Sequence, residues 1–75
     1  MDMVDVLIHV HPNLSAMERE KLEEELRALA GVISVHFSPG HPHLLTVAYD
    51  PQATSSTAIL AHAGTRGVEA TKVGL

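Results

Sequence analysis

A short alternating segment that runs directly into a capped helical pattern constrains the fold of this chain more than any other feature. From Asp5 to His11 every second residue is a β-branched hydrophobic one, which is typical of a strand with one buried face. The opposite face of this strand ends in two histidines, His9 and His11. Pro12-Asn13 then interrupts the extended chain. A strand followed by a tight turn is therefore predicted.

A helix is predicted after this turn, from Ala16 to about Ala30. Ser15 is a favourable N-cap residue, and Glu18, three residues later, completes a capping box. Gly31 is a residue type that commonly terminates a helix. Hydrophobic and charged residues separate onto two sides of the helix: Leu22, Leu26 and Leu29 on one, Glu20, Glu23, Glu24 and Arg27 on the other. The hydrophobic side requires a sheet to lie on.

Four further elements complete the predicted order, with a Pro39-Gly40 turn between the first two of them. They are strand Val32–Ser38, strand His43–Asp50, a helix that the Thr54-Ser55-Ser56 cluster caps and that extends to about Arg66 before Gly67, and strand Val68–Val73. The facing of the last strand stays open, because its hydrophobic residues do not share one parity. The buried side of the second helix is expected to consist of Ile59, Leu60 and Ala63.

The order strand-helix-strand-strand-helix-strand, with right-handed crossovers, predicts an α+β ferredoxin-like βαββαβ sandwich. Its four-stranded antiparallel sheet carries both helices on one face, and residues 1–75 form a single domain. Alternation assigns the inward-facing residues of the two middle strands: Val35, Phe37, Leu45, Val47 and Tyr49. It assigns the outward-facing ones as well: Ser34, His36, Ser38, Leu44, Thr46 and Ala48.

Composition excludes several classes of function. A formal charge of −4, with only five Lys and Arg, argues against nucleic-acid binding. No hydrophobic run approaches the length of a membrane span, and no leader precedes Asp2, so we expect a cytoplasmic protein or an excised domain, without membrane insertion. No catalytic motif and no cysteine nucleophile is present, and Ser15 near His11 lacks a third group to orient the histidine, so we do not expect an enzyme or a catalytic residue.

The sequence resembles a known family in three places. These are Leu26, Leu29 and Gly31-Val32 at the end of the first helix, Val47-Ala48-Tyr49-Asp50-Pro51 after the third strand, and Gly67-Val68-Glu69-Ala70 at the fourth strand. Together they make nearly the whole chain similar to the heavy-metal-associated domain of copper chaperones, P-type metal ATPases and mercuric-ion carriers. The resemblance implies the ferredoxin-like fold and a role in metal binding or metal transport.

The same resemblance implies a metal site that this chain lacks. The family binds a soft cation with two cysteines spaced three apart before the first helix, and these positions here are Ser15 and Glu18. The chain contains no cysteine, and a hydroxyl and a carboxylate are poor ligands for Cu(I). Leu14 to Glu18 is better explained as helix capping, so the usual chemistry of the family does not carry over.

Histidines offer a replacement, since six are present in 75 residues. Two His-x-His pairs, His9 with His11 and His41 with His43, flank the end of the sheet where the first strand ends and the third begins. Imidazole suits Zn, Ni and Cu(II), and three or four ligands complete a site. We predict these four residues as possible ligands of a divalent transition metal, with no certain cofactor. Strand parity counts against this, because it places His43 on the inward face and the first pair on the open face.

Two alternatives remain open beside the metal site. The histidines are equally compatible with scattered polar residues, although full protonation would move the formal charge from −4 to +2 in mild acid. The open face of the sheet, with Leu7, His9, Leu44, Thr46 and Ala48, is also more hydrophobic than such a face requires. The chain is then a metal-independent regulatory or protein-interaction domain that pairs with a second copy, or with another protein, through this face.

Overall fold

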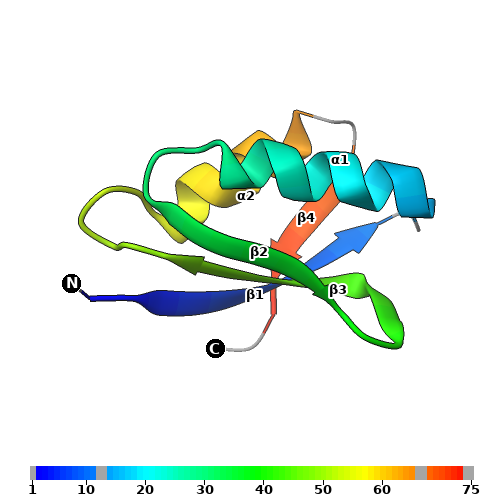
Figure 1. The fold of residues 1–75 in the computed structure, drawn as a ribbon. Coiled ribbons are helices and arrows are strands. Elements are labelled where there is room, and N and C mark those ends of the chain that lie inside the picture. The colour runs from blue at the N-terminus through cyan, green and yellow to red at the C-terminus, as the bar shows by residue number, and fades with distance from the viewer. Residues whose placement is uncertain (1, 12–13, 66–67, 74–75) are drawn as a thin grey trace.

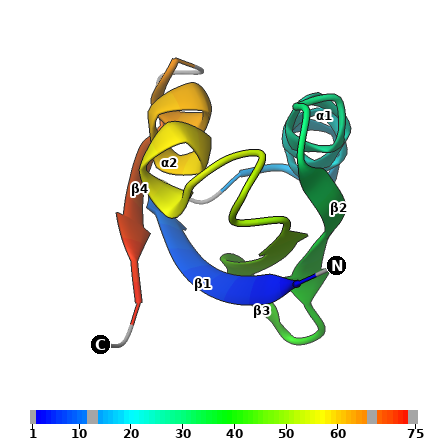
Figure 2. The same cartoon turned by 90° about the vertical axis from the view of Figure 1, so that its left-hand side faces the viewer.

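The predicted fold is confirmed. A computed structural model describes residues 2–11, 14–65 and 68–73. Its elements follow in the order β1 (Val4–His11), α1 (Ala16–Arg27), β2 (Val32–Ser38), β3 (His41–Tyr49), α2 (Ser56–Gly64) and β4 (Glu69–Lys72). The strands form one sheet in the order β2-β3-β1-β4, and every neighbouring pair is antiparallel. Both helices lie on the same face of this sheet (Figures 1 and 2).

The core fills the space between the sheet and the helices. β1 contributes its β-branched residues, and the two helices contribute the hydrophobic sides that the sequence predicts. The largest fully buried side chains are Ile8, Val10, Leu22, Leu26, Val35, Leu45, Val47 and Ile59. Leu29, Phe37 and Leu60 pack against this cluster and are partly buried. The predicted inward faces of β2 and β3 are therefore confirmed.

The first helix is shorter than predicted. It ends at Arg27, with Ala28 as its C-cap, and not near Ala30. Gly31 belongs instead to the turn into β2, where its φ is +89° and its carbonyl accepts a hydrogen bond from the N–H of Asp50 at 2.8 Å. Glycine is needed there for a second reason, because a Cβ at this position would lie 2.8 Å from the Cβ of Ala53. Gly31 was correctly predicted as a turn residue, but the helix ends before it, at Arg27.

The other predicted boundaries shift by small amounts. β3 begins at His41 and ends at Tyr49, so it starts before the predicted His43. α2 is capped by Ser55 and ends at Gly64, and the predicted end at Arg66 and Gly67 lies outside the described residues. β4 pairs with β1 so that Ala70 lies opposite Val10, which settles the facing that alternation left open. None of the helices among the described residues is long and hydrophobic enough to cross a membrane.

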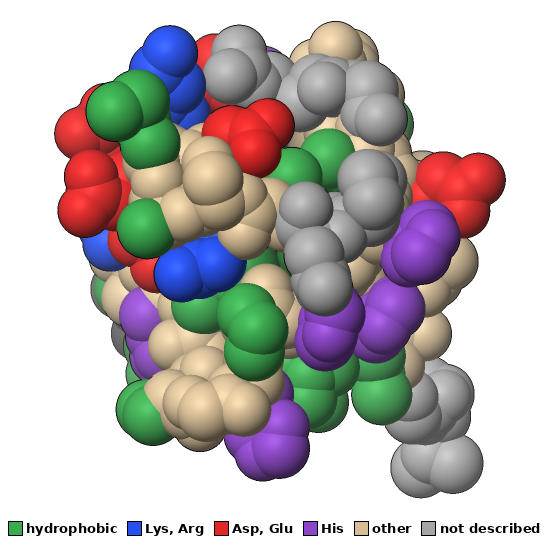
Figure 3. Space-filling view, turned by 90° about the vertical axis from the view of Figure 1, so that its right-hand side faces the viewer, with side chains coloured by type: hydrophobic (Ala, Val, Ile, Leu, Met, Phe, Trp, Pro, Cys, Tyr) green, Lys and Arg blue, Asp and Glu red, His purple; other side chains and the backbone are tan. Residues whose placement is uncertain are grey.

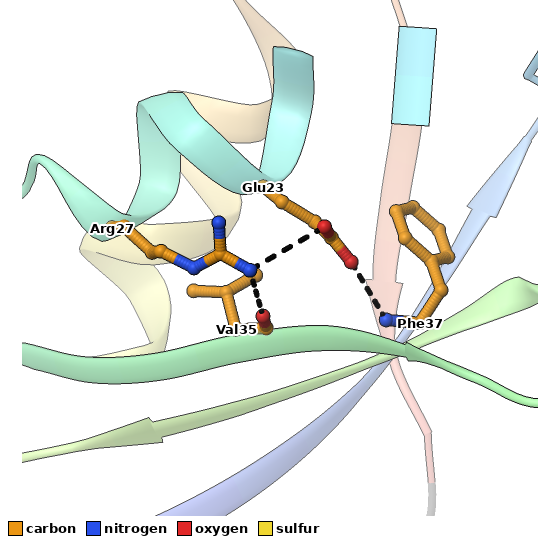
Figure 4. A network of polar contacts seen from close by, with 4 residues as sticks. All are labelled: Glu23, Arg27, Val35 and Phe37. Carbon is orange, nitrogen blue, oxygen red and sulfur yellow. Dashed lines mark hydrogen bonds and ion pairs between the residues drawn. The ribbon is translucent and has the colours of Figure 1, made fainter. Parts of the chain in front are cut away.

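Two charged residues of α1 bind the edge strand β2 (Figure 4). The carboxylate of Glu23 accepts a hydrogen bond from the N–H of Phe37 at 3.1 Å, and the Arg27 guanidinium donates to the carbonyl of Val35 at 2.9 Å. The two side chains also form an ion pair at 3.4 Å. Because β2 is an edge strand, these contacts cover backbone groups that would otherwise be open to a further strand.

Candidate functional site

The positions at which the family would place its cysteines carry a capping box. The hydroxyl of Ser15 accepts from the N–H of Glu18 at 3.2 Å, and the Glu18 carboxylate accepts from the N–H of Ser15 at 3.0 Å. A hollow of only about 40 Å³ lies beside them, lined by Leu14, Glu18, Leu22 and Val68. Ser15 and Glu18 therefore cap the start of α1. They do not form a site for a soft cation.

Two of the four predicted histidines are brought together. His9 lies on β1, between Leu44 of β3 and Thr71 of β4, and His43 lies near the start of β3. Their rings stack with centroids 5.7 Å apart and planes inclined by 19°. Both residues are half-buried. This pair is the centre of the candidate site.

Strand parity alone was wrong for His43, which it placed on the face opposite to His9. The pairing of β2 with β3 is irregular at this point: between Phe37 and Ser38 on β2, the partner residue on β3 changes from Leu45 to His41. One step on β2 therefore matches four steps on β3, and alternation along this part of β3 is interrupted. A bulge of this kind re-aims side chains, which explains how the two rings meet.

One ring nitrogen of the pair has no hydrogen-bond partner among the described residues. The Nδ1 atom of His43 is buried and makes no hydrogen bond to the described part of the protein. A buried polar atom without a partner costs about 1–3 kcal/mol. The position of this ring is therefore not fixed by a hydrogen bond at Nδ1, and its stacking on His9 is the specific contact that the structure gives for it.

The other two predicted ligands, His11 and His41, lie at strand ends, outside the stacked pair. His11 is exposed at the end of β1, opposite Glu69 of β4, and His41 is exposed at the start of β3, opposite Ser38. Across residues 2–11, 14–65 and 68–73, no three His, Cys, Asp or Glu side chains are grouped so that they could hold a metal ion. The four-histidine site is thus not preformed within one chain, and it stays a prediction.

Sequence reasoning did not find Glu69 as a neighbour of this site. Its carboxylate is carried by the residue directly opposite His11 across the β1–β4 ladder. Only the register of β4 reveals this relationship, and the sequence left that register open. Of the remaining histidines, His36 is exposed on β2 opposite Thr46, and His62 lies on α2. Figure 3 shows histidine side chains next to one another, beside hydrophobic ones, at this end of the molecule.

The chain has a ferredoxin-like fold of the kind found in heavy-metal-associated domains. No known protein family and no curated protein matches the sequence. Among solved structures, the N-terminal domain of a potential copper-translocating P-type ATPase from Bacillus subtilis, in its Cu(I)-loaded state, is similar with a TM-score of 0.87 and 16% identity. The match covers 97% of this chain and 90% of that one.

Two further structures show the same similarity. Oxidised MerP from Ralstonia metallidurans has a TM-score of 0.86 and 14% identity, over 97% of this chain and 100% of that one. The yeast copper transporter domain Ccc2a has a TM-score of 0.81 and 22% identity, over 92% of this chain and 93% of that one. At identities this low, the similarity establishes the fold and leaves the ligand to be argued from the residues of this chain.

Proposed function

We propose that this domain is a binding module for a divalent transition metal ion, with His9 and His43 as its principal ligands and His11 and His41 at its margin. The stacking of the two rings at 5.7 Å is the observation that carries the proposal, because it joins residues that local alternation placed on opposite faces. The fold supports it, since the similar domains from Bacillus subtilis and yeast are copper-loaded or copper-transporting by description.

The ligand chemistry selects the class of ion. Neutral imidazole nitrogens suit Zn, Ni and Cu(II), whereas Cu(I) prefers thiolates and thioethers. The chain has no cysteine, and the residues at the family's cysteine positions are held in helix capping. We therefore infer a change of ion class at a different place on the same fold. Protonated imidazole cannot coordinate, so binding is expected to weaken in mild acid.

Calorimetric titration with Zn(II) and Ni(II) tests this proposal. His9→Asn and His43→Asn should each weaken binding by about tenfold or more, which corresponds to ~1.4 kcal/mol. His62→Asn on α2 is the matched control, because it removes an imidazole from a helix outside the candidate site. Equal affinity in all four proteins, or no binding by the unaltered chain, would contradict the proposal.

A second candidate function is a metal-independent interaction through the open face of the sheet. Val73 is 39% exposed, and its N–H donates to the carbonyl of Leu7, which is itself only half-buried. Leu44 is half-buried as well and lies opposite His9. Hydrophobic residues on an open sheet face suit a protein partner.

The interaction function predicts association in the presence of a chelator. Sedimentation at high micromolar concentration, with EDTA and at two pH values, should then show a dimer that Leu44→Ser disrupts. A monomer under all of these conditions would count against pairing with a second copy. Leu44→Ser should leave Zn(II) binding unchanged, because this interaction does not depend on a metal ion.

A further inference from the structure

The stacked pair His9 and His43 offers two imidazoles, fewer than the four ligands of a structural zinc site. We propose that one metal ion bridges two copies of this chain, with His9 and His43 contributed by each copy. This inference rests on the proposed metal-binding function and adds the partner that completes the site. The partner is a second copy, and not a different protein, because the ligands that one chain lacks are those that another copy carries.

One chain brings together fewer imidazoles than a zinc ion binds. Zn(II) in structural sites is four-coordinate and tetrahedral. The described part of one chain brings only two imidazoles into contact and forms no group of three or more ligating side chains. Two copies supply four imidazoles, which matches the coordination number.

A two-fold symmetric dimer would present the same pair of histidines from each copy. In a dimer with a two-fold axis each subunit presents the same surface, so each contributes the same pair of side chains. A tetrahedral ion on that axis accepts two ligands from either side. His9 and His43 come from adjacent strands in one sheet, and therefore approach the axis as a unit. Rotation of the half-buried rings about their side-chain bonds is the adjustment that coordination requires.

The cross-strand surroundings of His9 are uncharged. The cross-strand neighbours of His9 are Leu44 and Thr71, neither of which is charged. The next pair along the ladder, Leu7 with Thr46, is uncharged too. Figure 3 shows histidine and hydrophobic side chains together at this end of the molecule. A second copy can therefore approach here without placing a like charge against the pair.

Overall charge makes this association dependent on the ion. Each chain carries a formal charge of −4, so two copies repel one another at long range. A bound dication offsets part of that repulsion and supplies the bonds between the copies. On the open face, Glu69 opposite His11 and Asp5 opposite Ala48 are the carboxylates carried by β1 and β4. Neither is a cross-strand neighbour of His9.

Zn(II) titration followed by sedimentation velocity tests the bridge in the full chain. We expect a doubling of mass that is greatest at one ion per two chains and that EDTA reverses. His9→Asn and His43→Asn should remain monomeric at this ratio. His62→Asn should still dimerise, because His62 lies on α2 and outside the stacked pair. X-ray absorption of the zinc adduct should show four nitrogen ligands at about 2.0–2.1 Å.

The outcomes separate the two proposals. Zinc binding by a protein that stays monomeric at every ratio would overturn the bridge and leave the proposed function intact. Absence of zinc binding would overturn both. A dimer that forms in EDTA and that persists in His9→Asn would overturn the bridge in favour of the metal-independent interaction. Circular dichroism and thermal unfolding of each variant establish that a lost dimer reflects a lost ligand and not a lost fold.

Discussion

Glu23 on α1 and Phe37 on β2 are joined by a hydrogen bond of 3.1 Å from the backbone N–H of Phe37 to the Glu23 carboxylate. The same carboxylate pairs with Arg27, whose guanidinium donates to the carbonyl of Val35 (Figure 4). The helix is therefore attached to the edge strand by polar contacts as well as by the hydrophobic core. An edge strand whose backbone groups are used in this way is less available to another chain.

Replacing Glu23 should lower the stability of the domain. Glu23→Ala removes a hydrogen bond from a partly buried backbone N–H to a charged acceptor, so we expect the free energy of unfolding to fall by about 1.5 kcal/mol. The exposed ion pair with Arg27 adds only about 0.3–0.5 kcal/mol. Urea unfolding measures the change. Glu24→Ala is the control on the same helix, because Glu24 is exposed and its side chain lies outside this network. Equal midpoints for the two variants would contradict the assignment.

The turn between α1 and β2 depends on Gly31. Gly31→Ala should destabilise the domain by about 1–3 kcal/mol, because φ there is +89° and the added Cβ would lie 2.8 Å from Ala53. Gly64→Ala provides the opposite test, since its backbone is helical and a Cβ there meets nothing within 4 Å apart from its chain neighbours and the backbone of its own helix. We expect it to stabilise the protein by about 0.5–1 kcal/mol. Thermal unfolding that moved in the same direction for both variants would be inconsistent with this account.

Local signals predicted most of the fold. The alternation in β1, the capping box at Ser15 and the hydrophobic side of α1 depend on residues a few positions apart, so the sequence contains them in full. The end of α1 was less predictable. Gly31 adopts its positive φ to let the chain pass Ala53 and hydrogen-bond to Asp50, contacts made with a segment that follows β3. Gly31 could be recognised from the sequence as a turn residue, but the sequence did not show that α1 already ends at Arg27.

The candidate site was predictable only as a set of residues. His9 and His43 meet where β3 departs from regular pairing between Leu45 and His41. Pro42 lies inside that segment and is a residue type that interrupts a ladder, but it does not show with which residues the pairing resumes. Glu69 became a neighbour of His11 only through the register of β4 on β1. The attachment of Glu23 to Phe37 spans 14 positions and needs the same kind of long-range information. Pairing register, which is a property of the assembled sheet, accounts for the first two, and the packing of α1 beside β2 accounts for the third.

The role of Ser15 distinguishes capping from metal binding. Ser15→Ala removes the acceptor of the Glu18 N–H, so the free energy of unfolding should fall by about 1 kcal/mol. The affinity for Zn(II) should stay unchanged, because the proposed ligands lie on β1 and β3. Parallel measurements of unfolding and of metal affinity check both statements. If Ser15→Ala weakened zinc binding as much as His9→Asn does, the metal site would have to include the start of α1.

Cysteines placed at positions 15 and 18 should give this fold a soft-metal site. We expect Ser15→Cys/Glu18→Cys to bind Cu(I), because it supplies the two thiolates, spaced three apart before the first helix, that the resemblance assigns to these positions. The same change removes both hydrogen bonds of the capping box, so stability without metal should fall by about 1–2 kcal/mol. Competition with a chromophoric Cu(I) chelator measures the affinity, and Ser15→Ala/Glu18→Ala controls for the lost cap. If the alanine variant bound Cu(I) as tightly as the cysteine variant, the two introduced thiolates would not be responsible for the binding. If the cysteine variant bound Cu(I) and still bound Zn(II) through His9 and His43, the two sites would be independent on one fold.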